Sequence, residues 1–355
     1  MITRLPLKIS VSGHPTFRFK TEIFALSFLI SSNIASSVLG AEVNVYSARE
    51  MQLVSPVFEA FTAKTGIKVN TIYIKEGLEE RIKAEGVNSP ADVILLVDAA
   101  KLIAASDMGL TQPVTTGSLE TAVPSTLRDP AGNWFAVTQR SRIVYASRDR
   151  VAQSAITYEE LADPKWKGRI CIRSGQHPYN ISLFAAAIDR LGPEKATEWL
   201  KGLKANLARK PSGGDRDVAK DILAGVCDIG IANTYYLGLM RNSPDPDQRA
   251  WGEAVKALDS TFGGGGTHVN ISGAAVAKNA PNRESAIQLI EFLVDEKAQN
   301  MLATLNYEYP VRQGTDANAT IGLFGPVRAD GLSLSEIASF RRQASEIVDQ
   351  IGFDQ

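Results

Sequence analysis

Short apolar runs alternate with helical patterns between residues 42 and 97, and this alternation constrains the fold more than any other feature of the sequence. Three runs rich in Val and Ile have the length of strands: 42–46, 67–73 and 91–97. Apolar residues at helical spacing over 51–64 and a charged segment at 79–85 predict the two intervening helices. Apolar strands that alternate with helices are typical of a parallel sheet with right-handed crossovers. The first part of the chain therefore predicts an α/β fold.

The middle of the chain repeats this order. The predicted elements are strands at 169–173 and 228–232 and helices at 180–191, 193–204 and 217–223. Two longer helices are predicted near the end of the chain, at 283–305 and 334–349. The 315 residues that follow residue 40 exceed the size at which one hydrophobic core usually stops growing, so two lobes are expected.

Two segments are candidates for the connections between these lobes. A long strand pattern at 135–145 predicts one crossing, and the second is placed at the glycine run 263–266. Glycines permit large backbone rotation, so this run is either part of a hinge or a flexible surface loop. We predict an N-lobe of residues 41–138 with 267–313, and a C-lobe of residues 139–266 with 314–355.

The first 40 residues have the pattern of a secretory signal peptide. Four basic residues precede an apolar run at 23–30: Arg4, Lys8, Arg18 and Lys20. Small residues then lead to a predicted cleavage site near Gly40. A membrane anchor is the alternative, and it is disfavoured because the apolar run is short of about 20 residues and is diluted by serines. We therefore expect the mature protein in the periplasm.

The two cysteines, Cys171 and Cys227, lie in or beside predicted strands. In an exported protein an isolated pair is most simply a disulfide, the alternative being two buried thiols. Two α/β lobes, export and a disulfide together predict a two-lobed periplasmic-binding-protein fold with two strand crossings as its hinge. Such folds close over a ligand by hinge motion.

Charge and motifs exclude several classes of function. Residues 1–40 hold four basic and one acidic side chain, so the 38 basic and 39 acidic residues of the chain leave a mature net charge near −4. This mild acidity gives no support to nucleic-acid binding. The two histidines after residue 40, His177 and His268, supply a catalytic triad poorly, and G-x-S-x-G, P-loop and HExxH motifs are absent. We expect a binding protein that is not an enzyme.

Three tyrosines stand where predicted strands end and helices begin, which is where open α/β sheets place their ligands. Tyr235 and Tyr236 follow the strand at 228–232, and Tyr179 occupies a similar junction. A phenol titrates near 10, and a bound cation drives its proton off. Ferric ion is small, triply charged and oxygen-seeking, so three phenolates would suit it. The alternative is that these tyrosines are half-buried packing residues. Because adjacent residues of a helix face different ways, convergence on one ion predicts a non-helical backbone at the pair.

The mature sequence resembles the ferric-ion-binding proteins of bacterial ABC importers over essentially its whole length. The resemblance is carried by Tyr179-Asn180, by Asn233-Thr234-Tyr235-Tyr236 and by segments at 43–49, 89–93, 171–175, 203–211, 213–217, 266–273 and 308–311. It implies that Tyr179, Tyr235 and Tyr236 bind Fe³⁺ through their phenolates. It also implies delivery to an inner-membrane ABC permease with its ATPase, by a protein that acts as a monomer.

Members of this family differ in what the first lobe contributes. Some place a histidine, or a His-Tyr pair, just after the Tyr-Ser-x-Arg segment, but here the segment continues Arg49-Glu50-Met51-Gln52. The pattern is similar to members that use three tyrosines and a small anion such as carbonate. Arg49 and Arg140 are the candidates to hold that anion, because a guanidinium fork matches planar oxyanions; for each, the alternative is a surface salt bridge. Glu50 is a candidate fourth ligand or simply an acid at a helix start.

Tyr46 is a further candidate, expected to hydrogen-bond within the cleft behind the ligands. Two other functions stay open at this point. One is a binding protein for an organic or anionic solute such as thiamine, a polyamine or a phosphonate, on which the tyrosines would stack. The other is an exported enzyme on the same fold, which the missing nucleophile–base constellation disfavours.

Overall fold

The structure is a computed structural model that describes residue 13 and residues 41–315, 317–326 and 328–355. The described residues from Ala41 to Gln355 form one compact unit. The predicted signal peptide, residues 1–40, lies outside the described residues except for Gly13. Within the described ranges, no helix is both long and apolar enough to cross a membrane.

A mixed sheet runs through this unit. Its main path follows the order β2 (Lys68–Tyr73), β1 (Glu42–Ser47), β3 (Val93–Leu96), β10 (Val269–Ala277), β5 (Phe135–Ser147), β8 (Ile229–Asn233) and β7 (Ile170–Cys171). Four further strands pair beside this path: β4 (Thr111–Gln112), β6 (Ala155–Thr157), β9 (Val255–Thr261) and β11 (Tyr309–Pro310). Strand β1 is parallel to β2 and β3, and β7 is parallel to β8, as the alternating pattern predicts. Strand β10 is antiparallel to both β3 and β5.

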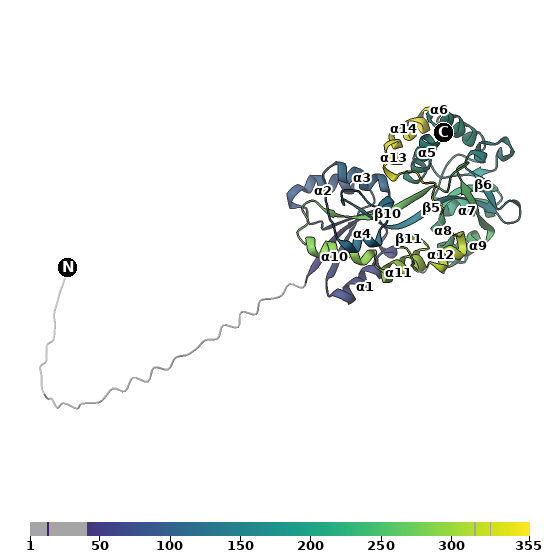
Figure 1. Cartoon of the computed structure of the whole chain (residues 1–355). Helices are drawn as coiled ribbons and strands as arrows, with labels where there is room; N and C mark the ends of the chain where they lie inside the picture. Colours follow the sequence, from purple (N-terminus) through teal and green to yellow (C-terminus); the bar gives the residue numbers. More distant parts are fainter. Residues whose placement is uncertain (1–12, 14–40, 316, 327) are drawn as a thin grey trace, which may run out of the picture. The chain divides into compact units, whose positions relative to one another are not determined.

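Helices flank both ends of the sheet (Figure 1). Those around β1–β3 are α1 (Ser55–Thr65), α2 (Leu78–Glu85), α3 (Ala99–Asp107), α4 (Gly117–Ala122) and α10 (Arg283–Leu293). Those around β7 and β8 are α5 (Pro178–Leu191), α6 (Pro193–Ala205), α7 (Asp215–Leu223), α8 (Thr234–Arg241), α9 (Pro246–Ala254), α13 (Leu334–Ser339) and α14 (Arg341–Gln350). Helix α11 (Glu296–Asn306) lies between these groups, and α12 (Asn318–Phe324) lies beside α8 and α9. Short 3₁₀ turns cover Met51–Leu53, Gly86–Asn88, Ser125–Leu127, Glu159–Ala162 and Pro164–Trp166.

Three long helices predicted from periodicity are each divided in two. The helix predicted at 51–64 starts as a 3₁₀ turn, and α1 begins only at Ser55. The helix predicted at 283–305 breaks because the Asp295 side chain accepts the Ala298 N–H and caps a new helix, α11. The helix predicted at 334–349 breaks at Phe340, between α13 and α14. A side chain that caps locally interrupts a helix without disturbing the apolar period on either side.

The two long strands β5 and β10 connect the two helix groups, and Figure 1 shows them side by side. The first half of β5 pairs with β10, and its second half pairs with β8 and β9. The glycine run is a turn between β9 and β10, closed by the Phe262 N–H donating to the Gly266 carbonyl at 3.0 Å. A Cβ on Gly266 would lie 2.3 Å from the Arg328 carbonyl oxygen, so a close backbone approach requires this glycine. The second crossing is therefore β10 itself.

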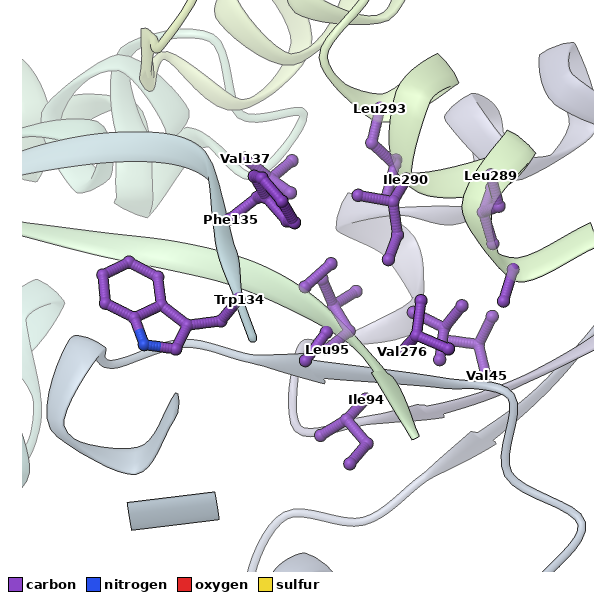
Figure 2. Packing of buried hydrophobic residues seen from close by; sticks show 14 of the residues in the cluster. Val45, Ile94, Leu95, Trp134, Phe135, Val137, Val276, Leu289, Ile290 and Leu293 are labelled. Carbon is purple, nitrogen blue, oxygen red and sulfur yellow. The ribbon is translucent and has the colours of Figure 1, made fainter. Parts of the chain in front are cut away.

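The hydrophobic core follows this division into two lobes. One cluster packs β1, β3 and β10 against α10 and neighbouring helices, and Figure 2 shows Val45, Leu95 and Val276 on the side of Leu289 and Ile290, with Ile94 on the opposite face of β3. Two other clusters cover the two faces of the β5–β8 region, with Val144 and Ile229 in one and Ile143 and Ala232 in the other. The predicted fold class, two α/β lobes joined by two strand crossings, is confirmed, and the residue boundaries of the lobes remain a prediction.

The predicted disulfide is present. Cys171 at the end of β7 is bonded to Cys227, which lies just before β8, and both residues are buried. The bond closes a loop with a sequence separation of 56 residues. On the chain-entropy model such a loop contributes about 4 kcal/mol to stability. The disulfide thus fixes the two parallel strands that precede the tyrosine-bearing helices.

Candidate functional site

A cavity of about 530 Å³ brings together side chains from both lobes. Tyr179, Tyr235 and Tyr236 line it from the side of α5 and α8. Arg49 and Glu50 line it from the segment after β1, and further residues come from β2, α3, β5 and β10. The sequence singled out these tyrosines on separate segments, and the fold places them in one cavity.

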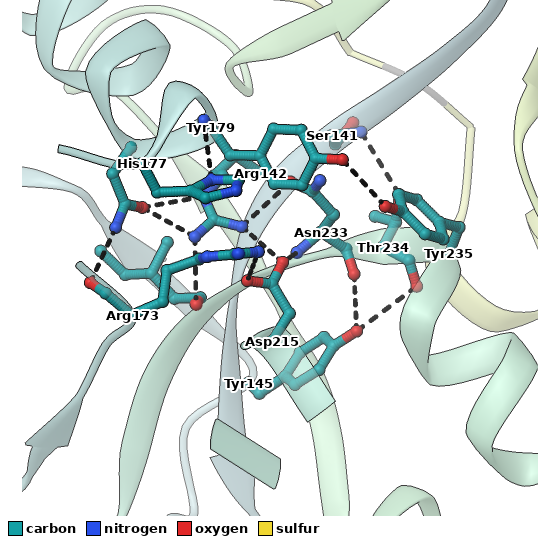
Figure 3. Close-up of polar contacts among 12 residues, drawn as sticks. Ser141, Arg142, Tyr145, Arg173, His177, Tyr179, Asp215, Asn233, Thr234 and Tyr235 are labelled. Carbon is teal, nitrogen blue, oxygen red and sulfur yellow. Dashed lines mark hydrogen bonds and ion pairs between the residues drawn. The ribbon is translucent and has the colours of Figure 1, made fainter. Parts of the chain in front are cut away.

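The three tyrosines stand in the first turns of two helices. Tyr179 follows Pro178 at the start of α5, and Tyr235 and Tyr236 follow β8 directly in α8. The hydroxyl oxygens of Tyr179 and Tyr235 are 3.4 Å apart, and a dashed line marks this contact in Figure 3. The rings of Tyr235 and Tyr236 are stacked with centroids 4.2 Å apart and an interplanar angle of 33°. Three phenols therefore meet at two helix N-termini, where the helix dipole favours anions.

The expectation of a non-helical backbone at the tyrosine pair is wrong. Both Tyr235 and Tyr236 belong to α8, which begins at Thr234. Stacking of the two rings keeps both side chains on the same side of the helix start, although their Cα–Cβ bonds diverge. The first turn of a helix has no preceding turn to crowd these side chains, which gives their rotamers this freedom.

Burial keeps the phenols of Tyr235 and Tyr236 protonated in the absence of a cation. It raises the pKa of Tyr235 well above the ordinary value, and the neighbouring Tyr179 and Tyr236 raise it further because adjacent phenolates repel. Burial, followed by Tyr179 and then by the Asp215 carboxylate, raises the pKa of Tyr236. A highly charged cation is the kind of group that reverses this balance.

An ion network lies directly beneath Tyr179 (Figure 3). The Asp215 carboxylate, which is 1% exposed, accepts hydrogen bonds from Arg142 at 2.6 Å and from Arg173 at 3.3 Å. It also accepts the backbone N–H of Asn233, the last residue of β8, at 2.8 Å. The carboxylate therefore ties the start of α7 to the strand that precedes the tyrosine pair.

The opposite charges in this network stabilise one another in their ionised forms. Burial by itself raises the pKa of the Asp215 carboxyl, but Arg142 and Arg173 more than offset this and hold the pKa below its ordinary value. The guanidinium carbons of Arg173 and Arg142 lie 5.4 and 5.8 Å from the centre of the Tyr179 ring. Arg216 lies 4.9 Å from the ring centre of Tyr236. Cations over the ring faces stabilise negative charge on the phenols.

The two arginines predicted to hold an anion have different surroundings. Arg49 is buried in an ion pair with Glu308 and also donates to Ser272 at 2.8 Å. Arg140 donates to the same serine at 3.4 Å and to the Val97 carbonyl, and its guanidinium carbon is 5.4 Å from the centre of the Tyr179 ring. Both arginines are buried, so neither forms the surface salt bridge that was the alternative interpretation. Within the described residues Arg140 has no carboxylate partner, so its charge is the more available to a ligand.

Of the two other predicted site residues, Glu50 lies in the cavity and Tyr46 does not. Glu50 lines the cavity and is exposed, accepting a hydrogen bond from Gln52 at 2.7 Å. Tyr46 is fully buried, and its hydroxyl donates to Glu85 of α2 at 2.9 Å instead of to a group of the cavity. Tyr46 therefore does not join the other candidates.

Several residues of the site were not predicted from the sequence. Glu308, Arg142 and Asp215 were overlooked, although Glu308 and Asp215 lie in segments that carry the family resemblance and Arg142 shares a strand face with Arg140. Tyr73 of β2 lines the cavity as a fourth tyrosine. His177, named above only as a poor source of a catalytic triad, caps α5 by accepting the Tyr179 N–H on Nδ1 at 3.2 Å.

The candidate metal ligands in the cavity are all oxygen atoms. In the described part of the chain no group of three or more His, Cys, Asp or Glu side chains is arranged to hold a metal ion. Phenol oxygens from Tyr179, Tyr235 and Tyr236, with a carboxylate of Glu50 nearby in the lining, are instead what a hard cation prefers. The arginines around them suit an accompanying oxyanion.

Comparison with known proteins gives consistent likenesses. The family model for bacterial extracellular solute-binding proteins matches residues 57–322. Iron uptake protein A1 of Synechocystis sp. is 46% identical over 314 residues, covering 88% of this chain and 87% of that protein. A Bordetella ferric binding protein of known structure is 52% identical with a TM-score of 0.83, over 88% of this chain and 100% of that one. A Trichodesmium protein solved in complex with iron and citrate ligands is 40% identical with a TM-score of 0.83, over the same shares of the two chains.

Proposed function

The chain belongs to the bacterial extracellular solute-binding proteins, and from that premise we propose that it is the periplasmic component of an Fe³⁺ ABC importer. It captures ferric ion in the cleft between its lobes and delivers it to an inner-membrane permease with its ATPase. The similar proteins of Synechocystis and Bordetella, named for iron uptake and ferric binding, support this proposal. Its residues act as ligands and charges, and no step of chemical turnover is assigned to them.

The observation that carries the proposal is the convergence of three phenols. Tyr179, Tyr235 and Tyr236 line one cavity, two of their hydroxyl oxygens are 3.4 Å apart, and each side chain starts at a helix N-terminus. As Fe³⁺ approaches, each phenol loses its proton to solvent and offers an anionic oxygen. Three phenolates neutralise the charge of the ion.

A small anion completes the coordination in this proposal. We assign it to Arg140 in preference to Arg49, because Glu308 already neutralises the Arg49 guanidinium. The cavity of about 530 Å³ exceeds what a ferric ion and carbonate need, so a larger carboxylate also fits. The Trichodesmium complex with iron and citrate supports a carboxylate in this place. Carbonate and citrate are therefore the two anions to compare.

A titration tests the proposal directly. Apo-protein receives Fe³⁺ with bicarbonate or with citrate, and the visible phenolate-to-iron charge-transfer band is followed. We expect a coloured one-to-one complex. Removing a partner of a metal ligand lowers metal affinity by about 10–100-fold, so losing ligands is expected to cost more than about 100-fold. The Tyr235→Phe, Tyr236→Phe double variant should lose colour and affinity.

The matched control is Tyr307→Phe, since Tyr307 is a half-exposed tyrosine outside the cavity. This variant should keep full colour. The proposal fails if the unmodified protein stays colourless with both anions, or if the double variant binds iron as tightly as the control. An Arg140→Gln variant separates the anion site: it should bind iron more weakly and lose its dependence on bicarbonate.

A further inference from the structure

A second, much smaller cavity shares Tyr179 and Arg140 with the lining of the large one. It has a volume of about 10 Å³, close to that of one bound water, and six residues line it: Arg140, Arg142, Tyr179, Asn233, His268 and Asn270. This space is too small for carbonate or citrate. Its occupant is a single atom or a molecule the size of water.

Two buried polar atoms of this lining have no hydrogen-bond partner within the described residues: Nδ1 of His268 and Nδ2 of Asn233. His268 is 1% exposed and Asn233 is 2% exposed, so bulk water does not reach them. Leaving a buried polar atom unpaired costs about 1–3 kcal/mol, which makes two together in one small cavity informative. If both atoms are donors, they favour an occupant that accepts hydrogen bonds.

The tautomer of His268 follows from its neighbours. Asn270 Nδ2 donates to the Ser182 hydroxyl oxygen at 2.9 Å, and that hydroxyl lies 3.1 Å from His268 Nε2. Among the described residues the Ser182 hydroxyl has no other acceptor, so it donates to Nε2. Burial, with the nearby Arg142 and Arg140, lowers the pKa of His268 to about 3, so the ring is neutral. Its single proton is therefore on Nδ1, which is a donor.

The acceptors in the lining are already engaged. Asn233 Oδ1 accepts from Arg142 at 3.0 Å, and Asn270 Oδ1 accepts the backbone N–H groups of Ala99 and Ile271. The Tyr179 hydroxyl is shared with Tyr235. A water molecule here would find two free donors, whereas the side-chain amide oxygens of the lining already have partners.

The charge of the lining is positive. Asp215 balances Arg142, but that carboxylate is shared with Arg173, and Arg140 has no acid partner within the described part of the chain. A buried, donor-lined and cationic space of this size suits a monatomic anion.

We propose that this cavity binds one halide ion, chloride in physiological salt, between Arg140, Arg142, His268 and Asn233. Tyr179 belongs to the lining of this cavity and also to that of the ferric cleft. If the proposed iron function holds, the halide and the anionic groups around the iron share the charge of Arg140, which lines both cavities, and they therefore compete for it. Iron loading should then weaken halide binding, and chloride should weaken iron binding by the same factor.

The primary experiment uses the apo-protein and needs no iron. Thermal unfolding is measured in sodium gluconate that is replaced stepwise by sodium chloride at constant ionic strength. A ligand that binds only the folded state raises the midpoint, by about 2 °C per tenfold increase in chloride once the site is saturated for a chain of this length. Equal midpoints in both salts overturn the proposal.

A variant and a direct measurement make the test specific. Asn233→Asp keeps the oxygen that Arg142 needs and supplies its own negative charge, so its midpoint should no longer respond to chloride. The matched control is Asn279→Asp, an exposed residue outside this cavity, which should respond like the unmodified protein. If Asn233→Asp does not fold, crystals of the unmodified protein decide: long-wavelength anomalous scattering should show chloride in the cavity, and a water-like peak there refutes the proposal.

The same salts then test the link to iron. Ferric titration in chloride should give a lower affinity than in gluconate, and the Asn233→Asp variant should show no such difference. Failure to bind iron in either salt contradicts the proposed function and leaves the halide site intact. Iron binding with no effect of chloride on apo-protein unfolding refutes the halide site alone.

Discussion

Replacement of Asp215 by Asn should lower the stability of the folded protein but let it retain iron to a lower pH. Because these two effects have opposite signs, the variant is the sharpest test of the site. Asn keeps the shape of the side chain but removes a buried charge that both Arg142 and Arg173 contact. Its amide nitrogen also meets the Arg173 donor in place of an oxygen. Removing one partner of a buried ion pair costs about 3–5 kcal/mol. With about 2.1 cal/mol/K of unfolding entropy per residue over 315 residues, the unfolding midpoint should fall by about 5–8 °C.

The effect on iron has the other sign. Asp215 is the third contributor, after burial and Tyr179, to the raised pKa of Tyr236. Without this carboxylate the phenol ionises more easily, so iron should be released at a lower pH than from the unmodified protein. The assay follows the charge-transfer band during acid titration, at a temperature where the variant is folded. The control is Asp217→Asn, which removes an exposed charge from the same helix.

Acid unfolding of the apo-protein tests the direction in which Asp215 changes stability with pH. Because the pKa of Asp215 is lowered in the folded state, its contribution to stability is complete above the ordinary carboxyl pKa of about 3.9 and is lost as pH falls through the lowered value. The variant should lack this part of the acid dependence. An unfolding midpoint within 1 °C of the unmodified protein, or iron release at a higher pH from a folded variant, would refute the reasoning.

Three further predictions follow from the same contacts. Reduction of the Cys171–Cys227 disulfide, or its replacement by two alanines, should lower the free energy of unfolding by about 4 kcal/mol, measured by urea unfolding with and without reductant. Glu308→Gln should cost about 3–5 kcal/mol because it leaves Arg49 buried without a counter-charge, and unchanged stability would show that the pair is not formed. Iron colour should bleach as pH falls, because protons compete for the phenolates, and a band that persists undiminished into acid would argue against tyrosine ligands.

Much of the fold was predictable because it depends on local patterns. The parallel strands β1, β2 and β3 follow from alternation of apolar runs and helices, and the Cys171–Cys227 bond follows from export and cysteine count. The helix breaks at Asp295 and Phe340 were missed because the apolar period continues across them. The second crossing was placed on the glycine run rather than on β10, because glycines indicate freedom of the backbone but not the direction of the chain.

The site was predictable only in part, for a physical reason. A tyrosine after a strand is a local signal, so Tyr179, Tyr235 and Tyr236 were found from the sequence. An ion pair between distant residues is not local: Arg49 and Glu308 are 259 positions apart, and nothing in either segment identifies the other. The same holds for the Asp215 carboxylate beneath Tyr179. Sequence reasoning therefore singled out the three tyrosines and the arginines Arg49 and Arg140, and it missed the long-range partners Glu308, Arg142 and Asp215.

Those charges bear on the form in which iron reaches the site. The cavity lining includes six basic side chains, Arg49, Lys75, Lys101, Arg140, Arg173 and Arg216, against four acidic ones, Glu50, Glu76, Asp98 and Glu308. With its phenols protonated, the cleft therefore repels a bare cation and attracts an anion. We therefore expect ferric ion carried by citrate or accompanied by carbonate to meet a favourable field. On the proposed ligand set, the phenolates form only as the metal arrives. This order makes the anion a condition of capture, and the comparison of bicarbonate with citrate in the ferric titration tests it: tight binding of Fe³⁺ with neither anion present would contradict it.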